Sequence, residues 1–438
     1  MMGLMVSEET GTTTSTPIRG SAESADPRSH PPRAWATRLV TVGIVLTALN
    51  LRPAITSFGA LLEDVRDGLG MSGSVAGLLT SVPPLCFAVF GVMAPRLARR
   101  FGPGAVVCAG MVAITAGLAI RPYTGSAVGF LAASALALMG IAVSNVLMPV
   151  IVKRWFPDRV GSMTGLYSMA LALGTSAAAA VTVPVTDALG GGWQSGLAVW
   201  AGLAAAAVLP WIGLVRAPGA DARDGERTRA ADPAPRESDG LRITRSRTAW
   251  ALAVFFGLQA TAAYITMGWM AQIFRDAGVS AGTAGLLLAV TMVMGVPLAF
   301  VIPRLATRMP HQGPIVVALG VCGLAGYAGL YLAPAGGAWA WALLLGVSNC
   351  AFPLALTMVG MRARTGAGVA QLSAFAQSTG YLISIPGPLL VGVLYQHSGG
   401  WGLPIALMAA LMIPQIAVGV LAGRDRTVED EAAPGRRA

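Results

Sequence analysis

The charged residues of this chain divide it into long apolar stretches, and their spacing constrains the fold more than any other feature. Stretches without Asp, Glu, Lys or Arg cover residues 68–95, 101–120, 122–152, 160–186, 188–215, 248–274, 277–303, 309–361 and 365–423. A membrane-spanning helix needs about 20 apolar residues, so the last two stretches each hold two spans around a central turn, at 334–337 and 397–400. With a further apolar run at 39–62, the pattern predicts an all-α polytopic membrane protein with twelve spans.

The composition agrees with a membrane location. Of 438 residues, 55% are hydrophobic and 11% are charged, whereas soluble domains carry about 25% charged residues. In a soluble protein the net charge of +10 would suggest nucleic-acid binding. Arginines gathered in short loops on one side of a membrane explain it better, so no nucleic-acid partner is expected. The cysteines and histidines show no metal-ligand spacing, and we predict neither a metal nor a cofactor.

Polar segments divide the chain into five parts. Residues 1–36 are rich in Ser, Thr and Pro and are expected to form a disordered cytoplasmic tail. Six spans follow at 37–216 and six more at 248–423. Between them lies a charged, proline-containing cytoplasmic linker at 217–247, and a cytoplasmic C-terminal tail is expected at 424–438.

The distribution of basic residues predicts the orientation. If both termini are cytoplasmic, the outer loops hold only Arg66, Arg121 and Arg275. The inner loops then hold the linker arginines together with Arg96, Arg99, Arg100, Lys153, Arg154, Arg159, Arg304, Arg308, Arg362 and Arg364. This asymmetry predicts a multi-pass protein of the inner (plasma) membrane with cytoplasmic termini. We expect it to be a monomer in the lipid bilayer.

The two halves of the chain share short sequence repeats. Residues 76–79 recur at 284–287 and residues 95–98 at 303–306, both at an offset of 208. A repeat of six spans predicts two pseudo-symmetric six-helix bundles, with a substrate site near the membrane midplane where they meet.

The segment 91–100 resembles the loop motif that the major facilitator superfamily carries between its second and third spans. The matching residues are Gly91, Arg96, Arg99 and Arg100. Pro95 stands where the family has Asp, and Ala98 stands where it has a second Gly. The resemblance implies the major facilitator fold and a conformational, gating role for the four matching residues.

A finer resemblance lies in the first two spans. Residues 50–56 and 76–81 are similar to the branch of the superfamily that contains cyanate permeases and 2-nitroimidazole exporters. Superfamily resemblance extends over 37–423, and membership of this branch implies a secondary carrier of small, mostly polar or anionic compounds.

Arg52 is the only formally charged residue well inside any predicted span. Such a charge costs about 2.5–3.5 kcal/mol on insertion scales. Helical spacing places Thr56 on the same polar stripe, and Pro53 is expected to bend the span and free the carbonyl of Leu49. The planar guanidinium matches carboxylate-like anions. The alternative is that Arg52 only bonds carbonyls or asparagines on neighbouring helices.

Other polar residues in the spans are candidates for the same cavity or for helix packing. Asn50 lies about 200° around the helix from Arg52, so an interhelical hydrogen bond is as well favoured as substrate contact. In the seventh and eleventh spans the candidates are Gln259, Tyr264, Gln377 and Tyr381. Asn145 and Asn349 occupy matching positions in the two halves, which favours a hinge or packing role. Trp269, near the outer end of its span, is interpreted as an interfacial anchor.

Several chemistries have no support in the sequence. No Asp or Glu lies deep in a span, since Glu63, Asp64 and Asp187 are at outer ends. Coupling to protons is left open, either with the substrate or through Glu63. There is no phosphate-binding loop for ATP and no catalytic constellation, so we do not expect an enzyme.

We therefore predict a secondary active transporter that works by alternating access. Its substrate would be a small anion or compact polar organic solute, such as cyanate or a monocarboxylate-like compound, with Arg52 as the anion-binding charge. The alternative is an exporter of nitro-aromatic or drug-like compounds in which Arg52 is structural. A non-transporting sensor or membrane-embedded enzyme is disfavoured by the lack of a catalytic cluster and an output domain.

Overall fold

The computed structural model describes residues 34–216 and 243–432. These ranges contain twelve helical segments long and apolar enough to span a membrane: Trp35–Ala60, Gly73–Gly91, Pro103–Tyr123, Ala127–Trp155, Ser162–Ala188, Trp193–Val215, Arg247–Asp276, Ala281–Thr307, Gly313–Leu332, Ala338–Met361, Gln371–Ser398 and Gly402–Ala422. The prediction of an all-α protein with twelve spans is confirmed. Most of the predicted tail at 1–36 and linker at 217–247, and the end of the C-terminal tail, lie outside the described residues.

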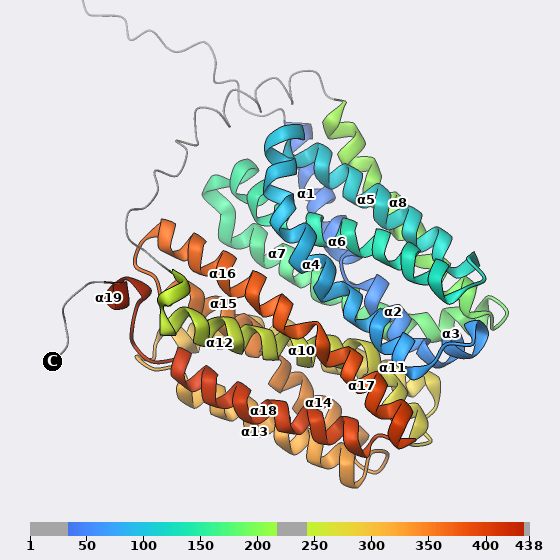
Figure 1. The fold of residues 1–438 in the computed structure, drawn as a ribbon. Coiled ribbons are helices and arrows are strands. Elements are labelled where there is room, and N and C mark those ends of the chain that lie inside the picture. The colour runs from blue at the N-terminus through green and yellow to red at the C-terminus, as the bar shows by residue number, and fades with distance from the viewer. Residues whose placement is uncertain (1–33, 217–242, 433–438) are drawn as a thin grey trace, which may run out of the picture.

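The helices form two bundles, seen in Figure 1 as a blue-to-green half and a yellow-to-red half. The first contains α1 (Ala34–Asn50), α2 (Pro53–Ala60), α3 (Leu62–Leu69), α4 (Gly73–Phe101), α5 (Pro103–Ile120), α6 (Ala127–Trp155), α7 (Val160–Ala188) and α8 (Trp193–Val215), with 3₁₀ turns at Arg121–Tyr123 and Pro157–Arg159. The second begins with a 3₁₀ turn at Ile243–Arg245. It continues with α10 (Arg247–Asp276), α11 (Ala281–Val293), α12 (Gly295–Thr307), α13 (Gly313–Leu332), α14 (Ala338–Asn349), α15 (Ala351–Met361), α16 (Gly366–Ser384), α17 (Pro386–Ser398), α18 (Gly402–Ala422) and α19 (Val428–Ala432).

The halves meet where α2, α4 and α7 contact α10, α11, α16 and α17. Each span runs in the opposite direction to the one before it, so the two ends of every described span lie at two opposite faces of the molecule. We call the face that holds the start of α1 and the end of α18 the terminal face, and the opposite one the far face.

The first span is broken, as Pro53 predicts. Helix α1 ends at Asn50, α2 begins at Pro53, and Arg52 occupies the junction with φ −123° and ψ −26°. Proline suits the first position of a helix because its missing N–H would have no partner there. On the neighbouring α7, Gly174 packs so closely on the carbonyl of Leu49 that a Cβ would overlap it. The break thus places a charged residue and irregular backbone inside the bundle.

Three spans of the second half are also broken. Helix α11 gives way to α12 at Met294, α14 to α15 at Cys350, and α16 to α17 at Ile385. In the eleventh span the new helix starts on Pro386, as the first span restarts on Pro53. Breaks are tolerated at membrane depth where protein or water satisfies the freed backbone groups.

The segment 91–100, predicted as a loop, is helical. Helix α4 continues to Phe101, and only Gly102 (φ 83°) separates it from Pro103, the first residue of α5. A positive φ suits glycine because it has no Cβ. The connection is therefore a one-residue turn, and its basic residues are carried on the last turns of a helix.

Two residues near the outer ends of spans, Arg121 and Trp269, are buried. Arg121 is 2% exposed and donates hydrogen bonds to the carbonyl of Ala54 (2.8 Å) and the hydroxyl of Ser57 (3.3 Å). Trp269 is fully buried, and its indole N–H donates to the hydroxyl of Thr80 in the other half (3.2 Å). The interpretation of Trp269 as an interfacial anchor was wrong, whereas Arg121 lies in the predicted connection between the third and fourth spans but is buried there; in both cases a protein partner takes the place of water.

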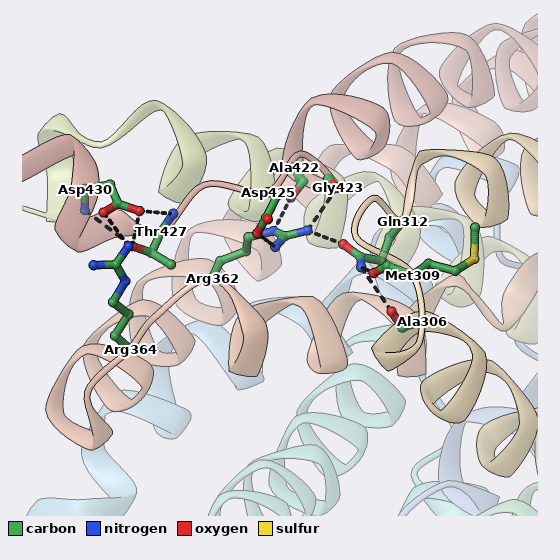
Figure 2. Close-up of polar contacts among 10 residues, drawn as sticks. All are labelled: Ala306, Met309, Gln312, Arg362, Arg364, Ala422, Gly423, Asp425, Thr427 and Asp430. Carbon is green, nitrogen blue, oxygen red and sulfur yellow. Dashed lines mark hydrogen bonds and ion pairs between the residues drawn. The ribbon is translucent and has the colours of Figure 1, made fainter. Parts of the chain in front are cut away.

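The described part of the predicted C-terminal tail is docked on the terminal face (Figure 2). Arg362 is 1% exposed and donates to the carbonyls of Ala422 (3.0 Å) and Gly423 (2.9 Å) and to the side-chain oxygen of Gln312. The N–H of Val428 in turn donates to the carbonyl of Arg362 (2.9 Å). The end of α15 thereby anchors the chain that leaves α18.

The short helix α19 sets acidic side chains against the starts of two spans. Glu431 accepts hydrogen bonds from the hydroxyls of Ser246 (2.7 Å) and Thr248 (2.8 Å) at the beginning of α10. Glu429 accepts from the backbone N–H groups of Arg364 (3.0 Å) and Thr365 (3.3 Å), just before α16. A carboxylate is stabilised beside a helix N-terminus, where backbone N–H groups lack partners.

Candidate functional site

A cavity of about 470 Å³ lies between the two halves. Its wall comes from Arg52 and α7 on one side and from α10, α11, α12, α14, α15 and α16 on the other. Three of the residues predicted for a binding site, Arg52, Tyr264 and Tyr381, line it together. They come from the first, seventh and eleventh spans, so only the folded two-half arrangement brings them together.

Arg52 lies in the cavity without an acidic partner. None of the ion pairs among the described residues involves it. Its guanidinium carbon is 5.9 Å from the centre of the Phe87 ring, and its electrostatic neighbours are Tyr264, Tyr381 and Tyr167. A cation over an aromatic face is attracted by the ring quadrupole, but this does not replace a counter-charge.

Tyr264 is the nearest polar neighbour of this guanidinium. Its hydroxyl is buried beside Arg52, short of full hydrogen-bond geometry, and bonds to no other described residue. The hydroxyl of Tyr381 likewise has no hydrogen bond within the described ranges, although its ring stacks on Phe87 with centres 5.0 Å apart. One cation and two tyrosine hydroxyls thus converge on the same end of the cavity.

Gln259 also lines the cavity, but its amide is engaged. The NH₂ group donates to the backbone carbonyl (2.9 Å) and side-chain oxygen (3.0 Å) of Asn349, and its own oxygen accepts from Gln415 (3.0 Å). Asn349 ends α14 at the break in the tenth span. In the other half, Asn145 accepts a hydrogen bond from the hydroxyl of Tyr167 (2.6 Å). Each of the two matching asparagines therefore joins two spans of its own half.

Three other predicted binding residues lie outside the cavity lining. Asn50 is 1% exposed and points away from Arg52, donating to the carbonyl of Leu203 on α8 (3.2 Å). Thr56 is fully buried and donates to the carbonyl of Arg52 (3.2 Å). Gln377 donates to a serine one turn earlier on its own helix (2.8 Å). In each case a nearby acceptor in the protein holds the polar group.

The predicted gating residues fall into two places. Pro53 is at the break beside Arg52, inside the bundle. Arg96, Arg99 and Arg100 are exposed at the terminal end of α4, and Gly91 is partly buried about one turn above them. No ion pair links these arginines to another described residue.

Sequence reasoning missed most of the cavity wall contributed by α7. Thr164, Ser168 and Thr175 line the cavity from this helix. Their spacing of four and seven residues puts them on one face of a helix, and this stripe of small polar residues was a usable signal. The apolar part of the wall, including Met292, Phe300 and Phe352, carried no signal because such residues are common in every span.

The cavity is open toward the terminal face and closed at the far face. Thr164, Phe300 and Leu356 are exposed at its open end. At the far face, α3 and α10 are joined across the halves, because Arg275 forms ion pairs with Glu63 and with Asp64, each at 2.9 Å.

Further contacts complete the closure at the far face. The hydroxyl of Ser74 in α4 donates to the side-chain oxygen of Gln396 in α17 (2.7 Å). Gly77 packs against the backbone of Leu389 so closely that a Cβ would lie 2.9 Å from its carbonyl oxygen. Small residues allow helices to approach to this distance, so this end of the interface is tightly packed.

Comparison with known proteins gives consistent results over nearly the whole chain. A sequence model of the Major Facilitator Superfamily matches residues 42–388. The uncharacterized transporter YycB of Bacillus subtilis (strain 168) is 35% identical over 92% of this chain and 97% of the relative. The 2-nitroimidazole transporter of Escherichia coli (strain K12) is 32% identical, with coverage of 89% and 97%. The cyanate transport protein CynX of the same organism is 29% identical, with coverage of 84% and 94%.

Solved structures show the same architecture. A bacterial homologue of the human lysosomal transporter Spinster, in an inward-facing and occupied conformation, aligns with a TM-score of 0.73. The alignment covers 93% of this chain and all of that one, at 15% sequence identity. At this identity the likeness concerns the fold alone.

Proposed function

We propose that this chain carries a small anion or compact polar organic solute by alternating access, with Arg52 as the anion-binding charge. The chain belongs to the major facilitator superfamily and is a membrane transporter of that type, not an enzyme. One observation carries this proposal. Arg52 lies in the cavity between the halves and has no acidic partner among the described residues. A charge this deep is costly unless it is compensated, and an anionic substrate compensates it whenever the site is occupied.

The names of two relatives agree with a small substrate. The similar proteins from Escherichia coli are named for cyanate, a small anion, and for 2-nitroimidazole, a compact polar ring. We propose that this chain shares a substrate of that size. In transporters of this architecture, the substrate site usually lies near the interface between the two bundles.

The orientation completes the proposal. The basic loops favour cytoplasmic termini in an inner membrane, and the cavity would then open to the cytoplasm with the far face outside. The structure would correspond to an inward-open state in which Arg52 exchanges substrate with the cytoplasm. We propose that the protein acts as a monomer, with its substrate as its partner and a coupled proton left open. Glu63, the outer acid considered for such coupling, is paired with Arg275.

Uptake into proteoliposomes tests the role of Arg52. Purified wild-type protein and Arg52→Gln are compared for saturable uptake of radiolabelled cyanate, acetate and benzoate. We expect at least one anion to be carried, and the variant to lose about tenfold or more, because hydrogen bonds to a charged group contribute about 1.5–3 kcal/mol each. Arg308→Gln, which removes an exposed arginine at the terminal face, is the matched control. Equal uptake by wild type and Arg52→Gln would remove Arg52 from the site.

A second candidate function is export of nitro-aromatic or drug-like compounds. It is favoured by the relative named for 2-nitroimidazole and by the tyrosine and phenylalanine rings at the cavity. Expression in a sensitive host and growth on a panel of toxic nitro-aromatics separates the two. Protection that survives Arg52→Gln would support export in which Arg52 does not bind the compound, whereas no protection by the wild type would count against export.

A further inference from the structure

We infer that the substrate is an organic monocarboxylate with an apolar body about the size of a six-membered ring, rather than a bare small anion or a polyhydroxy compound. The inference rests on the proposed function and narrows its substrate class. It follows from which hydrogen-bond donors of the cavity are free, and where they lie.

Several polar groups in the cavity wall are already satisfied by the protein. The hydroxyl of Thr175 donates to the carbonyl of Leu171 (2.7 Å), and that of Thr291 donates to the carbonyl of Leu287 (2.9 Å). Thr357 donates within its own helix in the same way (2.8 Å). The amide of Gln259 donates to both oxygens of Asn349 and accepts from Gln415, as described above. These side chains present mainly carbon to a ligand.

Three donors are gathered at the Arg52 end, whereas the hydroxyls of Thr164 and Ser168 lie on α7, Thr164 at the open end of the cavity. Apart from the contact between Arg52 and the hydroxyl of Tyr264, the guanidinium of Arg52 and the hydroxyls of Tyr264 and Tyr381 have no hydrogen-bond partner among the described residues. A guanidinium presents two parallel N–H groups to a planar two-oxygen acceptor, and each carboxylate oxygen can accept more than one hydrogen bond. One carboxylate therefore uses all three groups at once.

The remainder of the cavity is apolar and partly aromatic. Tyr381 stacks on Phe87 and meets Phe256 edge to face, with ring centres 5.0 Å and 5.3 Å apart. Phe256 contacts Phe352, which lines the cavity, at 5.7 Å. A sugar-like ligand would leave hydroxyls unpaired against these rings, which is unfavourable for buried polar groups. An apolar body is stabilised there by removal from water.

The size of the cavity points the same way. Its volume of about 470 Å³ lies within the range of about 300–1,000 Å³ that encloses ligands of drug-like size. A triatomic anion such as cyanate would occupy the Arg52 end and leave the apolar portion unfilled. It would then gain the electrostatic contacts but none of the apolar burial that a ring provides.

Binding measurements on the purified full-length protein test the inference. Isothermal titration compares benzoate with three other ligands. Acetate keeps the carboxylate without the ring, cyanate is a small anion, and nitrobenzene keeps the shape of benzoate without its charge. We expect benzoate to bind about tenfold or more tightly than each of the others, since burial of several ring carbons adds about 0.8 kcal/mol per carbon. Acetate or cyanate binding within twofold of benzoate would overturn the apolar body, and equal binding of nitrobenzene would overturn the carboxylate.

Two conservative variants test the tyrosine donors. Tyr264→Phe and Tyr381→Phe keep the rings, and each is expected to weaken benzoate about tenfold, as for one hydrogen bond to a charged group. Tyr327→Phe removes the hydroxyl of a buried tyrosine on α13, outside the cavity lining, and should leave benzoate binding unchanged. Unaltered binding in both cavity variants would overturn the three-donor arrangement, and thermal unfolding of each variant identifies loss of folding.

The outcomes separate this inference from the function on which it rests. Arg52-dependent uptake of cyanate without benzoate binding would leave the proposed anion carrier standing and overturn the monocarboxylate. If none of the anions binds or is carried, both fall.

Discussion

The ion pairs of Arg275 across the far face should hold the cavity closed on that side. Arg275 belongs to α10, whereas Glu63 and Asp64 belong to α3 in the other half. In alternating access the far face must open, and these two contacts must then break. The double variant Glu63→Gln, Asp64→Asn removes both charges while nearly preserving the shapes of the side chains.

The size of the effect follows from exposure. The side chain of Arg275 is 17% exposed, but those of Glu63 and Asp64 are 37% and 41% exposed, so solvent screens both pairs. Exposed ion pairs contribute about 0.2–1 kcal/mol each. Because both acids bind the same arginine, the entropy cost of ordering its long side chain is incurred once. A total of about 0.4–2 kcal/mol corresponds to a factor of roughly 2–30 in the ratio of far-face-closed to far-face-open molecules.

Spin labels at the far face measure that ratio. Tyr123→Cys and Leu332→Cys are exposed positions in opposite halves, 69% and 79% accessible, and electron–electron distances between labels report opening. The double variant should increase the long-distance population by the factor above. Asp67→Asn, which removes an exposed acid on α3 that takes no part in the ion pairs of Arg275, is the matched control. Unchanged distances in the double variant, or an equal shift in the control, would refute the reasoning.

Three further predictions concern stability. Arg362→Met should lower the thermal unfolding temperature, because the carbonyls of Ala422 and Gly423 and the side-chain oxygen of Gln312 lose a buried donor, at about 1–3 kcal/mol for each group left unsatisfied. Arg364→Met, at a 65% exposed side chain, should change it little. Burial would raise the pKa of Glu431, but hydrogen bonds from hydroxyls and an N–H at the start of α10 outweigh it and hold the pKa below its ordinary value. This stabilisation is present above the ordinary glutamate pKa of about 4.3 and is lost as pH falls through the lowered value. The difference in unfolding temperature between wild type and Glu431→Gln should therefore shrink in acid. A difference that grows in acid would contradict this prediction. Gly174→Leu should prevent α7 from packing on the broken first span and abolish folding or uptake, whereas Gly202→Leu, with open space around it, should be tolerated.

The spans could be predicted from the sequence because the membrane imposes a local rule. Twenty apolar residues between charges are sufficient to identify a span, so 334–337 and 397–400 were identified as turns without knowledge of the fold. Arg52 was recognisable for the same reason, since a charge inside such a run is rare. Pro53 indicated the position of the break because proline has no N–H to donate and its ring clashes with the preceding turn of a helix.

The partners of polar residues at the ends of spans could not be predicted. Arg121 and Trp269 looked like surface residues because a charge or tryptophan near a span end usually faces water or headgroups. Their actual acceptors, Ala54 and Thr80, lie far away in sequence. The same holds for the acids of α19, whose docking depends on helix starts more than 60 residues distant.

The cavity was predicted in part. Arg52, Tyr264 and Tyr381 meet as expected of polar residues in matching spans. Asn50 and Gln377 do not, because a carbonyl or hydroxyl within reach accepts a hydrogen bond from the NH₂ group of each. Composition alone cannot tell a polar residue that bonds to the protein from one that is left free for a ligand.

Charge rescue at position 52 tests the central claim most directly. In a background with Cys86, Cys108, Cys322 and Cys350 replaced by Ala, Arg52→Cys is treated with a thiol reagent that adds an ethylammonium group or with one that adds an ethylsulfonate. We predict that Arg52→Cys has lost anion uptake in proteoliposomes, that the ammonium reagent restores part of it, and that the sulfonate reagent does not. Uptake that persists in untreated Arg52→Cys, or that both reagents restore equally, would contradict a carrier that binds its anion through the charge of Arg52.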